Sequence, residues 1–417
     1  MKNMNSALLL LSFALLSLLM IACPKLENET DQRIVLEDNE AVLAQRLTQR
    51  NEIVALDSIP QMGRSVAAVP DTIILTLVAE VDPPIWNGDT LQANDVKIKG
   101  KRAYVAYNVA GETFLGGVDV FDIDDIYNPT LISQALFTDT DVNGLTFKND
   151  YLYLASATNG GDYSSPAILE RIAVNNGILT TNSTIVDIPS WAATDVDIAG
   201  NYIFVSSGAD NGYVTTLDKS SLEKIDSLSV EDARGVDSDG NDIGVVAGTP
   251  AQLVIFDKYS GEVVDTYSLS GANIDFSKST VKLRKRKAIL GLGDGGTQIV
   301  CLDNGNIIDE IPQPELDDLP LSKTVTNSVS ADKRLLFIAN GEAGVYVAAT
   351  NSNLNDNTCS LDSLHLVGKF RIGDGLSANH VEYNNDVLFV ASGLGGLKIF
   401  TVDMNNNDED DDDEDDN

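Results

Sequence analysis

The chain has 417 residues, of which 43% are hydrophobic and 22% are charged, so it can bury a sizeable core and is not generally disordered. Its formal net charge is −35, with 63 Asp and Glu against 28 Lys and Arg. Because nucleic acid and anionic lipid headgroups would be repelled by this charge, both are excluded as favourable partners.

A short apolar run near the N-terminus is typical of a signal peptide. Lys2 precedes ALLLLSFALLSLLMIA (7–22), which is short for a membrane span. The run ends in Met-Ile-Ala-Cys, which looks like a bacterial lipobox. We therefore expect a lipoprotein signal peptide over 1–22 and a diacylglyceryl group on Cys23. An ordinary secretory signal with an incidental cysteine is the alternative.

The residue after Cys23 bears on the location of the protein. Pro24 stands where an Asp would signal inner-membrane retention in enteric bacteria. The sequence therefore favours the outer membrane and leaves open whether the protein is periplasmic or surface-exposed. Two or more acyl chains on Cys23 would make a lasting membrane anchor.

Residues 23–71 are rich in Glu, Asp, Gln and Asn and are predicted to form a tether after the lipidated cysteine. Within them, LEDNEAVLAQRLTQR (36–50) is a possible helix, because its apolar residues follow a loose stripe. The residues of that stripe are Leu36, Val42, Leu43 and Leu47.

A strand that ends in a small-residue step recurs along the rest of the chain. The starts of these runs are 40 to 52 residues apart, which is the period of a supersecondary repeat. Seven runs share the pattern: AYVAYN (103–108), LYLASA (152–157), IFVSSG (203–208), IGVVAG (243–248), AILGLG (288–293), LFIANG (336–341) and LFVASG (388–393).

Each repeat contains further strand-like runs around this one. A polar pair opens a strand before it, GGVDVFDID (116–124) exemplifies the strand after it, and a weaker fourth run such as TLISQAL (130–136) follows. Gly, Asn and Asp turns separate the runs, and no helical periodicity intervenes. One four-stranded sheet cannot bury both faces alone, so the repeats predict an all-β, seven-bladed β-propeller of four-stranded antiparallel blades.

The two ends of the repeat array predict how the ring closes. The seventh unit has only three strands, and DTIILTLVAEV (71–81) precedes the first unit without a partner. We expect this N-terminal strand to complete the last blade, because pairing removes two open edges. The propeller would then span 72–404. Residues 405–417, with nine consecutive acidic residues from Asp408 to Asp416, are expected to be a disordered tail.

Two further cysteines belong to a chain that we expect to be exported, where disulfides are permitted. Cys301 lies in a strand-like run and Cys359 in a polar loop. We favour a buried thiol at Cys301 and keep a bridge between the two as the alternative.

The repeat resembles the LVIVD repeat of bacterial surface propellers over about 94–404. The similarity is carried by DVKIKGKRAYVAYN (95–108), GVDVFDIDDIYNP (117–129) and DVLFVASGLGGLKIFTVD (386–403). The resemblance implies an exported, membrane-attached propeller and no particular activity.

Catalytic and metal motifs are not evident in the sequence. There are only two histidines, His365 and His380, and neither a G-x-S-x-G elbow nor an HExxH motif is present. DTDVNGLTFKND (139–150) has the spacing of a calcium loop, but its centre aligns with the first strand of the other blades, which forbids that loop. We therefore assign no catalytic residue, no cofactor and no metal site.

The most defensible candidate site is geometric. The polar residues that open the first strands should surround one mouth of the axial channel, and convergent polar groups at a cavity suggest ligand binding. The alternative is that they cap turns between blades through backbone hydrogen bonds. The candidate residues are Asn94, Asp95, Asn143, Asp195, Arg234, Asn327, Asn379 and His380.

These observations favour a non-enzymatic interaction module over an enzyme. We expect a lipid-anchored monomer that binds a protein or polysaccharide through loops on one propeller face. A propeller enzyme, such as a glycan lyase or hydrolase that uses Asp95, Asp195 or His380, is the alternative, and a scaffold in envelope assembly is a third hypothesis. The sequence identifies no ligand.

Overall fold

The computed structural model describes residues 32–59, 72–208, 211–275 and 277–405. The expected signal peptide, the lipidation residue Cys23 and residues 406–417 of the acidic tail lie outside this part. Among the described residues, no helix is long and apolar enough to cross a membrane.

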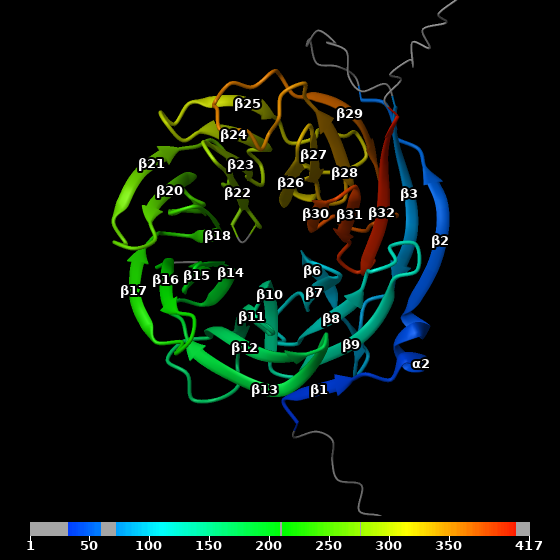
Figure 1. The fold of residues 1–417 in the computed structure, drawn as a ribbon, viewed down its shortest axis with the longest axis vertical. Helices are drawn as coiled ribbons and strands as arrows, with labels where there is room; N and C mark the ends of the chain where they lie inside the picture. The colour runs from blue at the N-terminus through cyan, green and yellow to red at the C-terminus, as the bar shows by residue number, and fades with distance from the viewer. Residues whose placement is uncertain (1–31, 60–71, 209–210, 276, 406–417) are drawn as a thin grey trace, which may run out of the picture. The chain divides into compact units, whose positions relative to one another are not determined.

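The described chain from Thr72 onward forms seven antiparallel blades around an axis, as the repeats predict (Figure 1). Blade 1 contains β6 (Gln92–Lys99), β7 (Arg102–Asn108), β8 (Gly116–Asp122) and β9 (Thr130–Phe137). Blade 2 contains β10 (Thr140–Lys148), β11 (Tyr151–Thr158), β12 (Ala167–Asn175) and β13 (Ile178–Asp187). Blade 3 contains β14 (Ala192–Ala199), β15 (Tyr202–Gly208), β16 (Tyr213–Asp218) and β17 (Lys224–Ser229).

The remaining blades repeat this order, with the first strand innermost. Blade 4 contains β18 (Ala233–Asp239), β19 (Asp242–Ala247), β20 (Gln252–Asp257) and β21 (Val263–Ser268). Blade 5 contains β22 (Thr280–Arg284), β23 (Lys287–Gly291), β24 (Thr297–Cys301) and β25 (Ile307–Ile311). Blade 6 contains β26 (Ser328–Asp332), β27 (Leu335–Ala339), β28 (Val345–Ala349) and β29 (His365–Phe370). Blade 7 contains β30 (His380–Asn384), β31 (Val387–Ala391), β32 (Leu397–Asn405) and β3 (Thr72–Val81).

The ring closes through the predicted N-terminal strand. β3 pairs antiparallel with β32, in a register that runs from Thr72 opposite Asn405 to Val81 opposite Leu397. The first and last parts of the propeller sequence thus share one sheet. This pairing gives both strands a hydrogen-bonded neighbour and confirms the predicted closure.

The core lies between the blades. In β7, five consecutive residues from Ala103 to Tyr107 are buried, because both faces of a middle strand are covered by neighbouring blades. Blades approach each other closely at some glycines. A Cβ atom added at Gly116 would lie 2.5 Å from the Thr140 carbonyl oxygen of the next blade, so this position requires glycine.

Residues 34–57, which we call the N-terminal arm, differ from the expected tether and helix. The arm contains β1 (Ile34–Glu37), the four-residue helix α2 (Glu40–Leu43), the 3₁₀ turn η3 (Ala44–Arg46) and β2 (Leu47–Val54). β1 pairs with β9 of blade 1 and β2 pairs with β3 of blade 7, so each sheet gains a fifth strand. The open edges of these blades supply backbone hydrogen bonds that outweigh a weak helical stripe.

A buried ion pair fastens the arm to blade 1. Arg46 Nη2 and Nη1 donate to the two Asp119 carboxylate oxygens at 2.6 and 3.1 Å, and Asp119 is fully buried. Arg46 Nε also donates to the Asp82 carbonyl oxygen that follows β3. Burial alone would lower the pKa of Arg46, but the Asp119 carboxylate outweighs it and raises that pKa. Arg46 therefore stays charged and joins blades 7 and 1.

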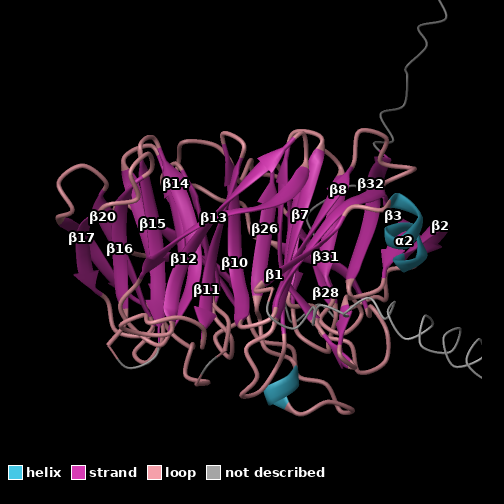
Figure 2. Cartoon of the chain, turned by 90° about the horizontal axis from the view of Figure 1, so that it is seen from below, coloured by secondary structure: helices cyan, strands magenta, loops and turns pink. Residues whose placement is uncertain are grey.

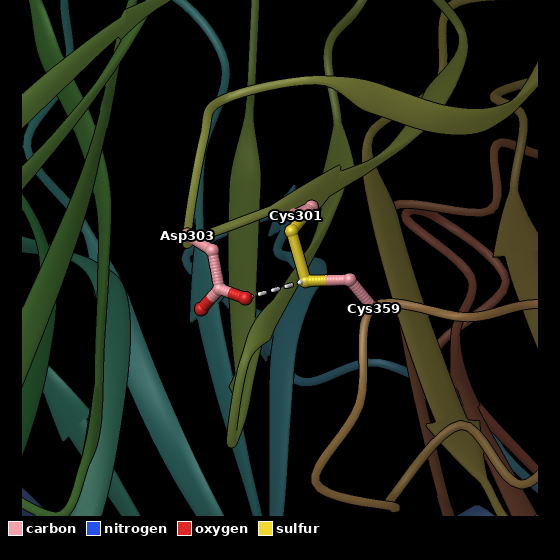
Figure 3. A group of neighbouring side chains, drawn as sticks. All are labelled: Cys301, Asp303 and Cys359. Atoms are coloured by element: carbon pink, nitrogen blue, oxygen red, sulfur yellow. Dashed lines mark hydrogen bonds between the residues drawn. A yellow bond between two sulfur atoms is a disulfide. The ribbon is translucent and has the colours of Figure 1, made fainter.

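The two cysteines form a disulfide, so the expectation of a free thiol at Cys301 is wrong (Figure 3). The loop between β28 and β29 crosses to blade 5 and places the Cys359 Cα 5.3 Å from that of Cys301. The buried Lys287 ammonium holds the same loop by donating to the Thr358 carbonyl oxygen at 2.6 Å. Asp303 lies beside the bridge, but both sulfurs are bonded to each other and leave no thiolate for a metal ion.

Candidate functional site

The candidate residues do lie at the starts of the innermost strands, but the four asparagines act mainly as links between blades. Each asparagine side-chain amide donates to a backbone carbonyl oxygen of the following blade. The pairs are Asn94 to Val142 at 2.7 Å, and Asn143 to Ala193, Asn327 to Ala378 and Asn379 to Ala93 at 3.0 Å each. This arrangement matches the capping alternative weighed from the sequence. Thr194, which sequence reasoning missed, makes the equivalent bond to the Ala233 carbonyl oxygen at 3.1 Å.

The two candidate aspartates also bridge blades. One carboxylate oxygen of Asp95 accepts the backbone N–H of Leu145 at 3.0 Å, and one of Asp195 accepts that of Val236 at 3.2 Å. Burial is the main cause that raises the pKa of Asp195. Both carboxylates therefore join neighbouring blades by hydrogen bonds and also place negative charge in the channel.

Five of the eight candidates line one small cavity near the start of the channel. Its volume is ≈ 10 Å³, which is about the room that one water molecule needs. The cavity therefore has no room for a sugar ring, which argues against a glycan-cleaving site at these residues. The lining residues are Asp95, Asn143, Thr194, Asp195, Arg234, Lys278, Thr280 and His380.

Lys278 is the main charged residue of this cavity that the sequence did not reveal. Its ammonium donates to the Asn94 carbonyl oxygen at 2.6 Å and lies 3.3 Å from Nδ1 of His380. Burial lowers the pKa of Lys278, and Asp95 and Asp195 oppose that effect. Lys278 precedes β22 in an irregular connection, so the repeat pattern carries no signal for it.

His380 is buried and neutral at neutral pH. Burial and the charges of Lys278, Lys97 and Lys282 together place its pKa well below the ordinary value. Its Nδ1 lies 3.2 Å from Asp95 Oδ1, and its Nε2 has no hydrogen-bond partner among the described residues. A Glu382 carboxylate oxygen lies 4.0 Å from Nε2. One water molecule in the channel would satisfy this nitrogen.

Deeper in the channel, the side chains two residues further along the innermost strands form a second charged layer. Lys282 lies 3.5 Å from Glu382, and burial together with Asp197 raises the pKa of Asp237 to about 7. Burial would lower the pKa of Lys97, but the surrounding carboxylates raise it. Basic and acidic side chains therefore lie next to each other inside the ring and partly neutralise each other's charge.

Arg234 forms a local ion pair. Its guanidinium pairs with Asp232 and donates to Ser277 Oγ at 2.9 Å. These bonds hold the connection between blades 4 and 5. Of the eight candidates, Arg234 is thus the one with its own salt-bridge partner in the preceding loop.

The calcium-like segment is interrupted by a strand, as its alignment indicated. β10 runs from Thr140 to Lys148, so Asp139 and Asp150 lie at opposite ends of an extended strand. Asp141 is instead half-buried and accepts the Leu115 backbone N–H at 3.1 Å. Burial raises the pKa of Asp141 to about 6.

Replacement of Asp141 by Asn should change how stability depends on pH. An unfolded Asp has a pKa of about 3.9, so the folded protein binds the proton more tightly and loses stability as pH rises from about 4 to 6. Asp141→Asn removes this loss, because an amide does not titrate and can still accept the Leu115 N–H. Urea unfolding at pH 4, 5, 6 and 7 should show a smaller decline for the variant than for the wild type. Parallel curves for the two proteins would contradict the assigned role.

Comparisons with known proteins identify the fold. No protein-family model matches the chain, and no curated protein matches its sequence. The WD40 repeats of RRP9 are 10% identical with a TM-score of 0.56, over 77% of this chain and 98% of that chain. A chain of the mitotic checkpoint complex is 13% identical with a TM-score of 0.55, over 84% and 96%. BamB from Moraxella catarrhalis is 14% identical with a TM-score of 0.47, over 86% and 99%.

The chain has a β-propeller fold. At 10% and 13% identity, the RRP9 and checkpoint likenesses show the fold alone. They do not test the resemblance to the LVIVD repeat, and they transfer no partner to this protein.

Proposed function

We propose that this protein is an interaction module of the bacterial outer membrane, anchored by a lipid on Cys23, that binds a protein or polysaccharide through the loops at one end of its propeller. The lipobox-like sequence and the LVIVD-like repeats support the location. The cavity at the starts of the innermost strands, with a volume of ≈ 10 Å³, is too small for a glycan, which supports binding by the loops over chemistry at that mouth.

We infer which face binds from the distribution of exposed apolar side chains. Because successive strands are antiparallel, the starts of the innermost strands share one end of the ring with the loops before the third strands. We call this end the loop face. It includes the small helix η4 (Leu321–Lys323), which lies below the ring in Figure 2.

Four large apolar residues on the loop face are more than half exposed. Ile85 and Trp191 are 64% and 62% exposed, and Leu321 and Leu394 are both 51% exposed. Ile85 lies in the hairpin of β4 (Ile85–Trp86) and β5 (Asp89–Thr90), and the other three lie in connections between strands. Exposed aromatic and aliphatic groups on loops are typical of recognition surfaces.

A cross-linking pull-down from the native envelope tests this proposal. The full-length lipidated protein should capture a specific protein or glycan, and a variant with Ile85→Ser, Trp191→Ser and Leu394→Ser should lose it. Tyr259→Ser is the matched control, since Tyr259 is 66% exposed but lies in the loop between β20 and β21 at the opposite end. Equal capture by all three proteins would rule out the loop face as the binding surface.

The same preparation tests the anchor. Cys23→Ala should move the protein from the outer-membrane fraction to the soluble fraction, because it removes the site of lipid attachment. If the variant still sediments with the outer membrane, the lipid anchor on Cys23 is wrong.

A further inference from the structure

The fourth strands of six blades share a bulge that leaves one apolar residue out of the pairing with the third strand. In blade 3, for example, Thr216 lies opposite Asp226 and Leu217 opposite Lys224, so Ile225 has no counterpart. The residue is aliphatic in every one of these bulges. The set is Ile132, Ile225, Val264, Ile308, Val367 and Val78, in blades 1, 3, 4, 5, 6 and 7.

The N-terminal arm covers this position where it passes. On blade 7, β2 pairs with the outer edge of β3, and Val78 is 1% exposed within a core cluster that includes Leu43 of the arm. On blade 6, Leu56 packs in the same cluster as Val367, which is half-buried. There Asp57 and Lys369 exchange two backbone hydrogen bonds, at 2.8 and 3.1 Å. The chain thus covers these blades by adding its own extended backbone.

The equivalent residues of blades 3 and 4 are exposed to solvent. Ile225 is 54% exposed and Val264 is 56% exposed, beside the exposed Val263. β17 and β21 are the last strands of their sheets among the described residues. Their outer edges therefore offer unpaired backbone groups next to apolar side chains, which is the arrangement that accepts an added strand.

The charges of these edges indicate the chemistry of a partner. Ile225 lies between Lys224 and Asp226, and Val264 lies between Val263 and Asp265. Glu223 and Glu262 precede these residues, and the four carboxylates are exposed, with Lys224 as the lone basic residue of β17 and β21. A second copy of this chain would bring the same carboxylates to the contact and be repelled. In the arm, a basic residue meets the edge: Arg50 of β2 pairs with Glu80 of β3 at 2.8 Å.

We propose that the outer edges of blades 3 and 4, formed by β17 and β21, bind an extended segment of a partner protein by strand addition. The segment carries aliphatic residues for contact with Ile225 and Val264, and Lys or Arg residues for contact with the carboxylates beside them. It occupies the positions that the arm occupies on blades 6 and 7. This surface lies on the circumference of the ring, apart from the loop face, and does not depend on it.

A peptide derived from the arm is the probe. It has the arm sequence LTQRNEIVALD (47–57) with Glu52→Lys and Asp57→Lys, and the unchanged peptide serves for comparison. Hydrogen exchange of the full-length protein should slow at the backbone amides of β17 and β21 when the basic peptide is added. The basic peptide should bind more tightly than the unchanged peptide, and salt should weaken its binding.

Variants of the protein test whether the peptide binds at β17 and β21 and not at another strand edge. Ile225→Lys combined with Val264→Lys should raise the dissociation constant of the basic peptide by about tenfold, because charge replaces the apolar contact and repels the peptide. Ile53→Lys is the control, since Ile53 is 76% exposed on β2, away from both edges. Because all three positions are exposed, the variants should fold as the wild type does, and thermal unfolding checks this.

Three results would overturn the proposal. The first is that the basic peptide does not bind and does not slow hydrogen exchange in β17 or β21. The second is protection confined to β3 and β29, which would mean that the peptide exchanges with the arm. The third is sedimentation that shows a dimer lost in the double variant, which would make a second copy the occupant.

Discussion

Replacement of Cys301 and Cys359 by Ala should lower the free energy of unfolding by about 4 kcal/mol, because the bridge restricts the unfolded chain over a sequence separation of 58 residues. The bridge also ties the loop between β28 and β29 to blade 5, where Lys287 remains as a second attachment. Urea unfolding without reductant measures the difference between variant and wild type.

Reduction of the wild-type protein is the internal control for this prediction. Since reduction and substitution break the same cross-link, unfolding with reductant should bring the wild type close to the double variant and leave the variant unchanged. A variant as stable as the oxidised wild type would mean that the bridge contributes nothing to folding.

Arg46→Ala should lower the free energy of unfolding by about 3 kcal/mol, because it leaves the buried Asp119 carboxylate without its charged partner. Gln134 Nε2 still donates to Asp119 at 3.1 Å but brings no charge. The loss should appear in urea unfolding at neutral pH. The arm should also become more accessible to protease between β1 and β2, since Arg46 joins it to blade 1.

Arg50→Ala provides the matched control for Arg46→Ala. Arg50 lies in the same arm and pairs with Glu80, but both side chains are partly exposed, so the pair is screened by water. Its removal should leave the unfolding curve almost unchanged. Equal losses for the two variants would show that the arm is stabilised by charge in general and not by the buried pair.

The structure places the candidate residues near the starts of the innermost strands, where several of them form hydrogen bonds between neighbouring blades. The polar residues before the innermost strands do encircle the channel, because the repeat places them at equivalent points of each blade. Four of them prove to be amide links between neighbouring blades. For Asn94, Asn143 and Asn327 the partner carbonyl oxygen lies about one repeat further along the chain, and for Asn379 it lies in blade 1, 286 residues away, where the ring closes. Every residue type has a backbone carbonyl, so the sequence does not indicate which one will accept the bond. Lys278 was missed because it lies in an irregular connection outside the repeat.

The N-terminal arm shows where local pattern misleads. Leu36, Leu43 and Leu47 suggested one helical stripe, yet Leu36 pairs in β1, Leu43 is buried at the end of α2 and Leu47 begins β2. A short segment with weak helical preference adopts the structure that a neighbouring sheet edge supplies. That edge exists only after the blades have formed, so its effect cannot be read from residues 34–57 alone.

The sequence by itself determined the seven blades and the closing strand, because strand periodicity, turn residues and a constant repeat length are local and recur along the chain. Only the tertiary structure decided the Cys301–Cys359 bridge, the Arg46–Asp119 pair, the Lys278–His380 contact and the bare edges of β17 and β21. Each of these depends on which distant segments meet when the ring closes. Such contacts are set by the packing of whole blades, and a one-dimensional pattern does not contain that information.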